Sequence, residues 1–284
     1  PKTPRQPAEI KNLDDYKSMV DEYDTGIWYA DKRLGEIFDK LKEQGIYEDA
    51  VIIVSSDHGE SLGENGSYCE HGEADEPVTH IPLIIKWPGC PRNAVSKGFH
   101  YNVDLLVTLM DMIGDIPEFT CNRVVGLPNS VRYDGISFAD CIRKGIDGGR
   151  DYLVVSQMAH VCQRAVRFED WIYIRTYHDG YHLTEPDELF NIKEDPHETE
   201  NVAEKYPEVC WRGAYLLEHW VADNMLSNIY RTDIDPLWSV IADGGPFHCR
   251  GYLEKYCERL EDTGRGELAR QLKNRHPEEY KISY

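Results

Sequence analysis

The stretch AVIIVSSDHGESLGENGSYCEHGEADEPVTHIPLIIKWPG, residues 50–89, decides how this chain folds and where its chemistry lies. The β-branched run Val51–Val54 is too short for a helix and predicts a buried core strand. Asp57 and His58 follow where that strand ends, and Gly59 permits a turn that would bring both side chains to one centre. A carboxylate beside an imidazole is a donor set that suits a divalent cation.

A long polar loop separates this strand from a second apolar run, which begins after His80. Polar loops of this length between core strands are uncommon and are usually functional or disordered. The loop contains His71 and several acidic residues. We interpret the acidic residues as solvated charges, one of which could orient a ligand histidine: Glu60, Glu64, Glu70 and Glu73.

The motif Ser-Asp-His-Gly-Glu and the later segment Pro-Leu-Ile-Ile-Lys-Trp-Pro-Gly together resemble the C-terminal metal motif of the sulfatase family, in the alkaline-phosphatase superfamily. The resemblance implies that Asp57 and His58 bind the metal, which would be Ca²⁺ or, alternatively, Mn²⁺ or Zn²⁺. In this family a Lys-Gly pair that contacts the substrate sulfate lies nine residues before an Arg-x-Pro-Leu segment. His71-Gly72 has the same spacing to His80-Ile81-Pro82-Leu83. The resemblance therefore places His71 in the substrate site, as a cation or a general acid, and we expect His80 to be structural.

Further segments continue the resemblance in chain order: Tyr101–Met110, Asp134–Ser137 and Glu188–Ala203. The likeness covers the chain to about Ala203, but only the C-terminal half of the family's fold. The Cys/Ser-x-Pro/Ala-x-Arg motif, from which the family makes its formylglycine nucleophile, does not occur in this sequence. We therefore expect the N-terminal part of the enzyme to be missing, and this chain to be catalytically inert by itself.

The implied fold class is α/β. Residues 1–150 would form the C-terminal part of an alkaline-phosphatase-like sheet sandwich with a parallel sheet, and residues 151–284 a smaller antiparallel α+β domain with terminal helices. A helix is predicted from Leu13 to Gly45, capped by Asn12, with an apolar stripe that packs on the sheet. Strand-like periodicity predicts four short strands: Tyr152–Gln157, Arg164–Phe168, Trp171–Tyr177 and Asp187–Ile192. Two more helices are predicted at residues 207–229 and 251–273.

Bulk composition limits the partners of this chain of 284 residues. The net charge of −20 argues against a nucleic-acid partner, which would need clustered Lys and Arg. No apolar run reaches the roughly 18 residues needed to span a membrane, so no membrane contact is expected. Eight cysteines without a CxxC pair favour free thiols in a reducing compartment, and hence a cytoplasmic location.

Three functions remain open from the sequence. The first is a sulfatase, a metal-dependent sulfuric ester hydrolase that acts on a sulfated small molecule or glycan. The second is a phosphodiesterase or phosphonate monoester hydrolase of the same superfamily, in which His71 would be a metal ligand. The third is a non-catalytic binding or assembly fragment. The terminal helices carry no recognisable motif, and we assign them to packing or to contacts within a homo-oligomer.

Overall fold

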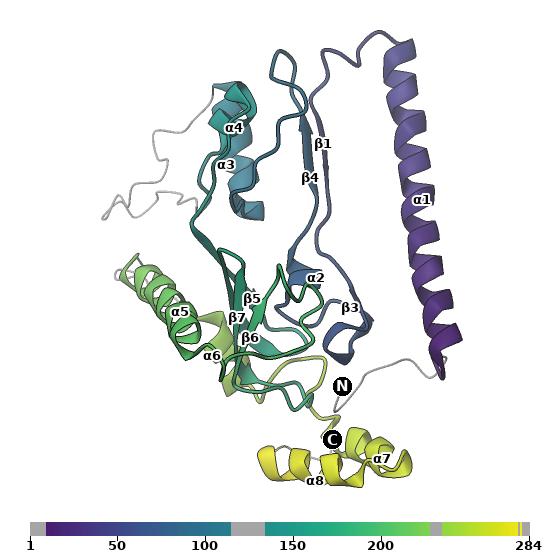
Figure 1. Ribbon diagram of the computed structural model, residues 1–284, viewed down its shortest axis with the longest axis vertical. Coiled ribbons are helices and arrows are strands. Elements are labelled where there is room, and N and C mark those ends of the chain that lie inside the picture. The colour runs from purple at the N-terminus through teal and green to yellow at the C-terminus, as the bar shows by residue number, and fades with distance from the viewer. Residues whose placement is uncertain (1–9, 115–133, 228–234, 278, 280–284) are drawn as a thin grey trace.

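The computed structural model of the chain describes residues 10–114, 134–227, 235–277 and 279. Figure 1 shows a long helix beside a two-stranded sheet, and a separate four-stranded sheet with helices around it. In chain order the elements are α1 (Leu13–Glu43), β1 (Ile52–Ser55), β2 (Ser61–Leu62), the 3₁₀ turn η1 (Glu64–Gly66), β3 (Tyr68–Glu70), α2 (Glu76–Thr79), β4 (Leu83–Lys86), α3 (Asn102–Ile113), α4 (Ala139–Lys144), β5 (Tyr152–Gln157), β6 (Cys162–Phe168), β7 (Trp171–His178), β8 (Asp187–Asn191), α5 (Pro207–Ser227), α6 (Pro236–Ala242), α7 (Leu253–Asp262) and α8 (Gly266–Arg275).

Helix α1 forms where its sequence pattern predicts it. The Asn12 side chain accepts hydrogen bonds from the backbone N–H groups of Asp14 and Asp15, which confirms the predicted cap. The expected packing of its apolar stripe is wrong for the described residues, because α1 contains no buried residue and the stripe residues Ile27 and Ile37 are 56% and 54% exposed. A cleft separates the helix from the two-stranded sheet, and its lining includes Leu34, Phe38, Ile52 and Ile84.

The predicted core strand forms as β1, but in a different setting from the one expected. It pairs antiparallel with β4, with Val54 opposite Ile84, and β4 is its only partner among the described residues. Val51 is 43% exposed and Ile84 is 64% exposed, so the prediction of a buried strand in a parallel sheet is wrong here. The physical reason is that a sheet of two strands has too few neighbours and covering elements to bury its faces.

The four predicted strands of the second half are confirmed as an antiparallel sheet in the order β5-β6-β7-β8. The hairpin between β6 and β7 turns at Glu169, whose φ of 46° is left-handed. Side chains alternate between the two faces of the sheet. One face packs against α5 through residues that include Val154, Val166, Tyr173, Leu189 and Leu217, and the other face contacts Ala74 through Ala165, Ile172, Ile174 and Phe190. The polar loop before β4 therefore covers one face of this sheet.

Gly213 controls how closely α5 approaches the sheet. A Cβ at this position would lie 2.4 Å from the Cβ of Tyr173, which is fully buried. We expect Gly213→Ala to lower the free energy of unfolding by about 1–3 kcal/mol, because overpacking forces the helix away from the sheet. Gly35→Ala in α1 is the matched control, since nothing lies within 4 Å of its Cβ and it should stabilise the chain by about 0.5–1 kcal/mol. Urea unfolding of both variants measures the difference, and equal stabilities would contradict this account.

Two segments that carry the sulfatase resemblance are joined through Asp104 of α3. Its buried carboxylate accepts hydrogen bonds from the backbone N–H groups of Tyr101 and Ile136, and it forms an ion pair with Arg150. Gly135 belongs to the second of these segments and packs against the first, since a Cβ there would be 2.2 Å from the carbonyl oxygen of Val103. The Asp-Gly pattern at 134–135 is thus explained by close backbone packing beside a buried carboxylate.

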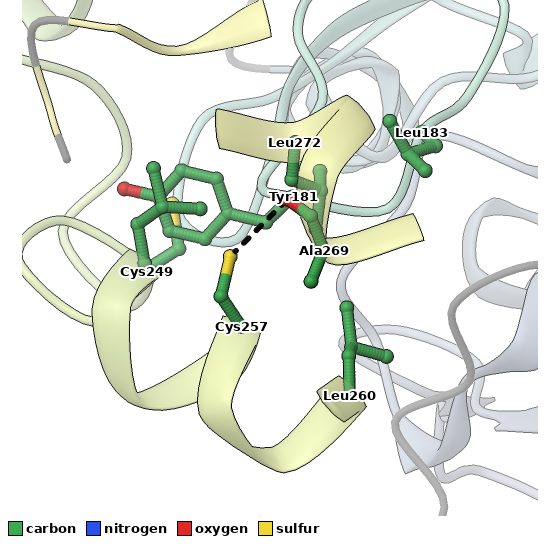
Figure 2. Packing of buried hydrophobic residues seen from close by; sticks show 8 residues of the cluster. Tyr181, Leu183, Cys249, Cys257, Leu260, Ala269 and Leu272 are labelled. Atoms are coloured by element: carbon green, nitrogen blue, oxygen red, sulfur yellow. Dashed lines mark hydrogen bonds between the residues drawn. The ribbon is translucent and has the colours of Figure 1, made fainter. Parts of the chain in front are cut away.

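The C-terminal helical segment is two helices rather than the single one predicted at 251–273. The chain turns between α7 and α8 at Gly264, which has a φ of 76°. Figure 2 shows buried side chains of both helices, such as Leu260 and Leu272, gathered near Tyr181 from the loop after β7. The helix predicted at 207–229 is confirmed as α5, although its last two predicted residues lie outside the described ranges.

None of the helices in the described ranges is both long and apolar enough to cross a membrane. No disulfide joins the seven cysteines that lie in those ranges.

Candidate metal and substrate site

Asp57 and His58 lie side by side at the end of β1. The backbone N–H of His58 donates a hydrogen bond of 3.1 Å to Oδ1 of Asp57, and this bond holds the pKa of the Asp57 carboxyl below its usual value. The Asp57 side chain is 86% exposed. Gly59 is required by space, since a Cβ there would lie 2.0 Å from the carbonyl oxygen of Pro77. The Asp57 carboxylate is therefore open to solvent, while the backbone at Gly59 packs closely against Pro77 of α2.

The donor atoms of this pair fit a divalent cation. His58 Nδ1 lies 2.8 Å from the carbonyl oxygen of Gly59, so Nδ1 carries the proton and Nε2 keeps its lone pair. His58 Nε2 is 3.6 Å from Asp57 Oδ2. Metal–ligand bonds to nitrogen and oxygen are about 2.0–2.5 Å long, so one cation can contact both atoms. The assignment of Asp57 and His58 as ligands stays a prediction, which this geometry supports.

His71 lies against His58. The two imidazole rings stack with their centroids 3.9 Å apart, and His71 Nδ1 is 3.5 Å from Glu60 Oε2. His58, Glu60 and His71 form a group whose ligand atoms all lie within 4.8 Å of one another. The structure thus brings His58, Glu60 and His71 together. The sequence indicated four acidic residues that could orient a histidine, without choosing among them. In the structure Glu60 is the one that lies beside His71.

The loop that carries His71 is fastened to the four-stranded sheet. The side-chain amide of Gln157, at the end of β5, donates to the His71 carbonyl oxygen over 2.8 Å. The Ala74 N–H donates to the side-chain oxygen of Gln163 in β6 over 3.1 Å. These side chains lie far along the chain from the loop, so the second half of the chain fixes the position of a candidate site residue in the first half.

Acidic side chains are buried where the loop meets the sheet, so the prediction that Glu73 is a solvated charge is wrong. Glu73, Asp75 and Glu198 are each no more than 3% exposed, and Ser67 Oγ donates to Glu73 over 2.8 Å. Burial and the charge of Glu73 raise the pKa of Asp75 to about 7. Burial and the charge of Asp75 likewise raise the pKa of Glu198. The raised pKa keeps the Asp75 carboxyl partly protonated near neutral pH, which makes its burial beside Glu73 and Glu198 tolerable.

His80 lies apart from this group. Its Nδ1 is 3.0 Å from Glu76 Oε1 on the neighbouring turn of α2, and this hydrogen bond raises the pKa of His80. Glu76 also accepts from Arg167 of β6 over 3.0 Å. These contacts link α2 to the sheet, as expected for a structural role.

Two histidines that the sequence did not single out lie next to the candidate site. His160, between β5 and β6, has its ring centroid 6.3 Å from that of His71. His248 stacks on His160 at 4.5 Å, with the ring planes only 12° apart. No local motif marks either residue. The one available signal was the position of His160 shortly after the predicted strand 152–157, whose last residue, Gln157, binds the loop at His71.

A second group with metal-ligand chemistry comprises His178, His276 and Glu279. His178 Nδ1 accepts the backbone N–H of Gly180 over 3.1 Å, so its Nε2 carries the proton that faces Glu279 Oε1 at 3.0 Å. A metal at Nε2 would need that proton removed. The group is therefore better described as a closed hydrogen-bond network than as a metal site.

Comparison with known proteins shows what this chain is similar to. Residues 2–115 match the sulfatase family model. The chain is 27% identical over 192 residues to a choline-sulfatase of Rhizobium meliloti, and 29% identical over 188 residues to an arylsulfatase K of Danio rerio. Each alignment covers 64% of this chain but only 32% and 33%, respectively, of those proteins. The chain thus spans about a third of the length of these curated relatives.

Solved structures show the same fold. A 2-O GAG sulfatase superposes with a TM-score of 0.62 at 21% identity, over 81% of this chain and 48% of that chain. A phosphonate monoester hydrolase from Silicibacter pomeroyi superposes with a TM-score of 0.54 at 24% identity, over 69% of this chain and 39% of that one. At these identities the likeness concerns the fold, which is the mixed helix-and-strand, alkaline-phosphatase-like fold of the sulfatases. The family-model match over residues 2–115, the sulfatase relatives and the shared fold together show that this chain is similar to the sulfatases.

Proposed function

We propose that this chain supplies part of the metal and substrate site of a sulfatase, which hydrolyses the sulfate ester of a small molecule or glycan. The observation that carries the proposal is the cluster at the end of β1. There Asp57 Oδ2 and His58 Nε2 converge to 3.6 Å, and the ring of His71 lies against that of His58.

Asp57 and His58 would hold the cation, with Ca²⁺ as the first candidate and Mn²⁺ or Zn²⁺ as alternatives. A divalent cation bound there would supply positive charge toward an oxygen of the sulfate group. His58 donates its Nδ1 proton to the carbonyl oxygen of Gly59, which leaves the Nε2 lone pair for the cation. With Nε2 bound to the cation, the ring could not also act as a base. His71 is half exposed and is oriented by Glu60, so it can contact the sulfate or deliver a proton to the leaving alcohol.

In this proposal, further residues from outside this chain complete the site. An open hollow of about 1390 Å³ lies between β4, α3 and β5, and Asp57 is among its lining residues. Apolar side chains nearby are exposed, with Ile84 at 64% and Leu106 at 55%. We propose that the other half of the family's fold covers this surface and carries the nucleophile to Asp57. This chain alone would then bind cation weakly and hydrolyse nothing.

A phosphodiesterase or phosphonate monoester hydrolase is the second candidate. The observation that favours it is the close group of His58, Glu60 and His71, which could hold a metal ion with His71 as a direct ligand. In that case His71 would be lost from substrate binding, and the site would prefer Zn²⁺ or Mn²⁺ over Ca²⁺ because imidazole nitrogen replaces oxygen donors.

Replacement of His71 distinguishes the two candidates. In the complete enzyme, His71→Ala should lower kcat for an aryl sulfate by about 10²–10³-fold while the metal content stays near that of the parent. Metal analysis and steady-state kinetics on sulfate, phosphodiester and phosphonate monoester substrates measure both effects. Loss of metal in proportion to activity, with phosphonate as the preferred substrate, would overturn the sulfatase proposal. His80→Ala is the control, because His80 contacts Glu76 rather than the site.

A further inference from the structure

We infer that two buried carboxyls, Asp75 in the polar loop before β4 and Glu198 after β8, form a proton-dependent joint between that loop and the four-stranded sheet. In acid the joint is neutral and the loop stays packed on the sheet. As the pH rises the carboxyls ionise and the loop detaches more often. The joint controls the position of His71, which goes beyond the proposed hydrolysis and does not rest on it.

The two carboxyls hold one turn of the loop from two sides. Asp75 Oδ1 accepts the Val78 N–H over 3.3 Å and caps α2, and Asp75 Oδ2 accepts the Asn65 side-chain amide over 3.0 Å. Glu198 Oε1 accepts the Glu76 N–H over 2.9 Å, across 122 positions of the chain. The start of α2 is therefore fixed both by a carboxyl of its own and by one from the segment after β8.

The held turn is continuous with the part of the loop that carries His71. Ala74 packs on the sheet, and its N–H donates to Gln163 Oε1 over 3.1 Å. Gln157 donates to the His71 carbonyl oxygen over 2.8 Å. Release of the turn at Asp75 would strain both of these contacts, so the joint influences how firmly His71 is held.

The nearby cations contact a different carboxylate. Arg167 and His80 both pair with Glu76. Within the described ranges, no lysine or arginine forms an ion pair with Asp75 or Glu198. The two side chains are 0% and 3% exposed, and Glu198 Oε2 is buried without a hydrogen-bond partner. A buried carboxylate that lacks both a cation and a full set of donors is costly, whereas the protonated acid carries no charge to desolvate.

Other charged groups face the joint from the loop, from α2 and from the sheet. Glu73 lies in the same turn, Glu76 begins α2, and Glu188 in β8 is close to Glu185. His182, from the loop after β7, has Nδ1 3.8 Å from Glu73 Oε1, so a protonated His182 would offset part of this negative charge. The surroundings of the joint are acidic in sum, and they oppose the ionised form of both carboxyls.

The direction of the pH effect follows from the proton affinity of the packed joint. Burial and the charge of Glu73 raise the pKa of Asp75 to about 7, and burial and the charge of Asp75 raise the pKa of Glu198. An exposed carboxyl has a pKa of about 4, so the stability from the joint is fully present below about pH 4 and is lost as the pH rises through about 7. For Asp75 alone, the equilibrium constant for opening should rise about tenfold between pH 6 and pH 8.

Hydrogen exchange of the whole chain, read by mass spectrometry in peptides that cover residues 70–79, measures this opening at pH 6 and pH 8. The variants Asp75→Asn and Glu198→Gln keep a hydrogen-bond acceptor at each position but cannot ionise. After correction for the intrinsic exchange rate, the rise in the opening constant should be at least about tenfold larger in the parent than in the double variant. Glu198→Gln alone should reduce the rise by at least about threefold, and it decides the matter if the double variant does not fold.

Glu200→Gln is the matched control, because Glu200 lies two residues beyond Glu198 and is exposed. It should keep the full pH dependence of the parent. The same rise in the parent and in Glu198→Gln, or an opening constant in the parent that does not change between pH 6 and pH 8, would overturn the inference. None of these measurements uses a substrate or a metal, so a failure of the proposed function would leave their result unaffected.

Discussion

An Asp57→Ala variant of the complete enzyme is expected to lose its bound cation and at least about a thousandfold in kcat/KM for sulfate esters. Asp57 is the anionic member of the proposed pair, and its carboxylate lies 3.6 Å from the one His58 nitrogen that keeps a lone pair. Without that charge, a neutral imidazole alone binds a hard dication poorly. Elemental analysis after gel filtration and kinetics on an aryl sulfate measure the two losses together.

The Asp57 side chain is 86% exposed, so its removal should leave the thermal unfolding midpoint nearly unchanged. Asp140→Ala is the matched control, because Asp140 is also an exposed carboxylate and pairs with Lys144 on its own helix. That variant should keep both metal and activity. Full turnover in the Asp57→Ala enzyme would remove Asp57 from the site and, with it, the proposed mechanism.

Replacing His276 by alanine is expected to lower the stability of the C-terminal helices by about 3 kcal/mol. His276 Nε2 is 2.8 Å from Asp179 Oδ1 and its Nδ1 is 3.0 Å from Glu279 Oε1. Asp179 is buried and also accepts from Arg275 over 2.7 Å. Loss of the imidazolium leaves two largely buried carboxylates short of a partner, at the joint between α8 and the loop after β7.

The same contacts predict how this stability depends on pH. Burial by itself would lower the pKa of His276, but the hydrogen bonds and charges of Asp179 and Glu279 outweigh it and raise the pKa to about 9. The ordinary histidine value is about 6.5, so the stabilisation is fully present below about pH 6.5 and is lost as the pH rises through about 9. Burial would raise the pKa of Asp179, but its hydrogen bonds to His276 and Arg275 lower it to about 2. That contribution is present above about pH 4 and is lost as the pH falls through about 2.

Urea unfolding between pH 5 and pH 10, followed by helical circular dichroism, measures this effect. The parent should lose stability on the alkaline side, whereas His276→Asn, which cannot become a cation, should show a flatter profile. His219→Ala is the control, since His219 is 52% exposed and lies 3.7 Å from Asp223 on the same helix. Identical pH profiles for the parent and His276→Asn would contradict the assigned role of His276.

Local pattern was sufficient to predict α1 and the four strands of the second sheet. Asn12 predicted the start of α1, because an asparagine cap depends only on the first helical N–H groups. The alternation of apolar residues after Asp151 predicted all four strands of the second sheet, since a strand's period is a local property. Asp57 and His58 could also be predicted as a pair from the sequence, because they are neighbours in the chain just after one strand.

The strand partners and the burial of those elements could not be predicted from local sequence pattern. The period of β1 suits a strand but carries no information on its partners, so the antiparallel pairing with β4 came only from the structure. Glu73 has the same local sequence character as Glu70, which is only partly buried. Glu73 is buried because Ser67 and the four-stranded sheet enclose that turn of the loop. Gly264 gave a weak signal that the last helical segment would divide into α7 and α8.

By itself, the sequence determined the strand that precedes Asp57 and His58 and the likeness to sulfatases, and it carried the prediction that this pair binds a cation. Only the tertiary structure decided that His71 stacks on His58. It alone also decided that His160, which is far along the chain from residues 50–89, contacts the ring of His71, and that His248 stacks on His160. The physical reason is that ring contacts depend on the meeting of separate segments. Here those segments are joined by two hydrogen bonds that no local pattern predicts: Gln157 donates to the carbonyl oxygen of His71, and the carbonyl oxygen of Ala159 accepts from the His248 N–H.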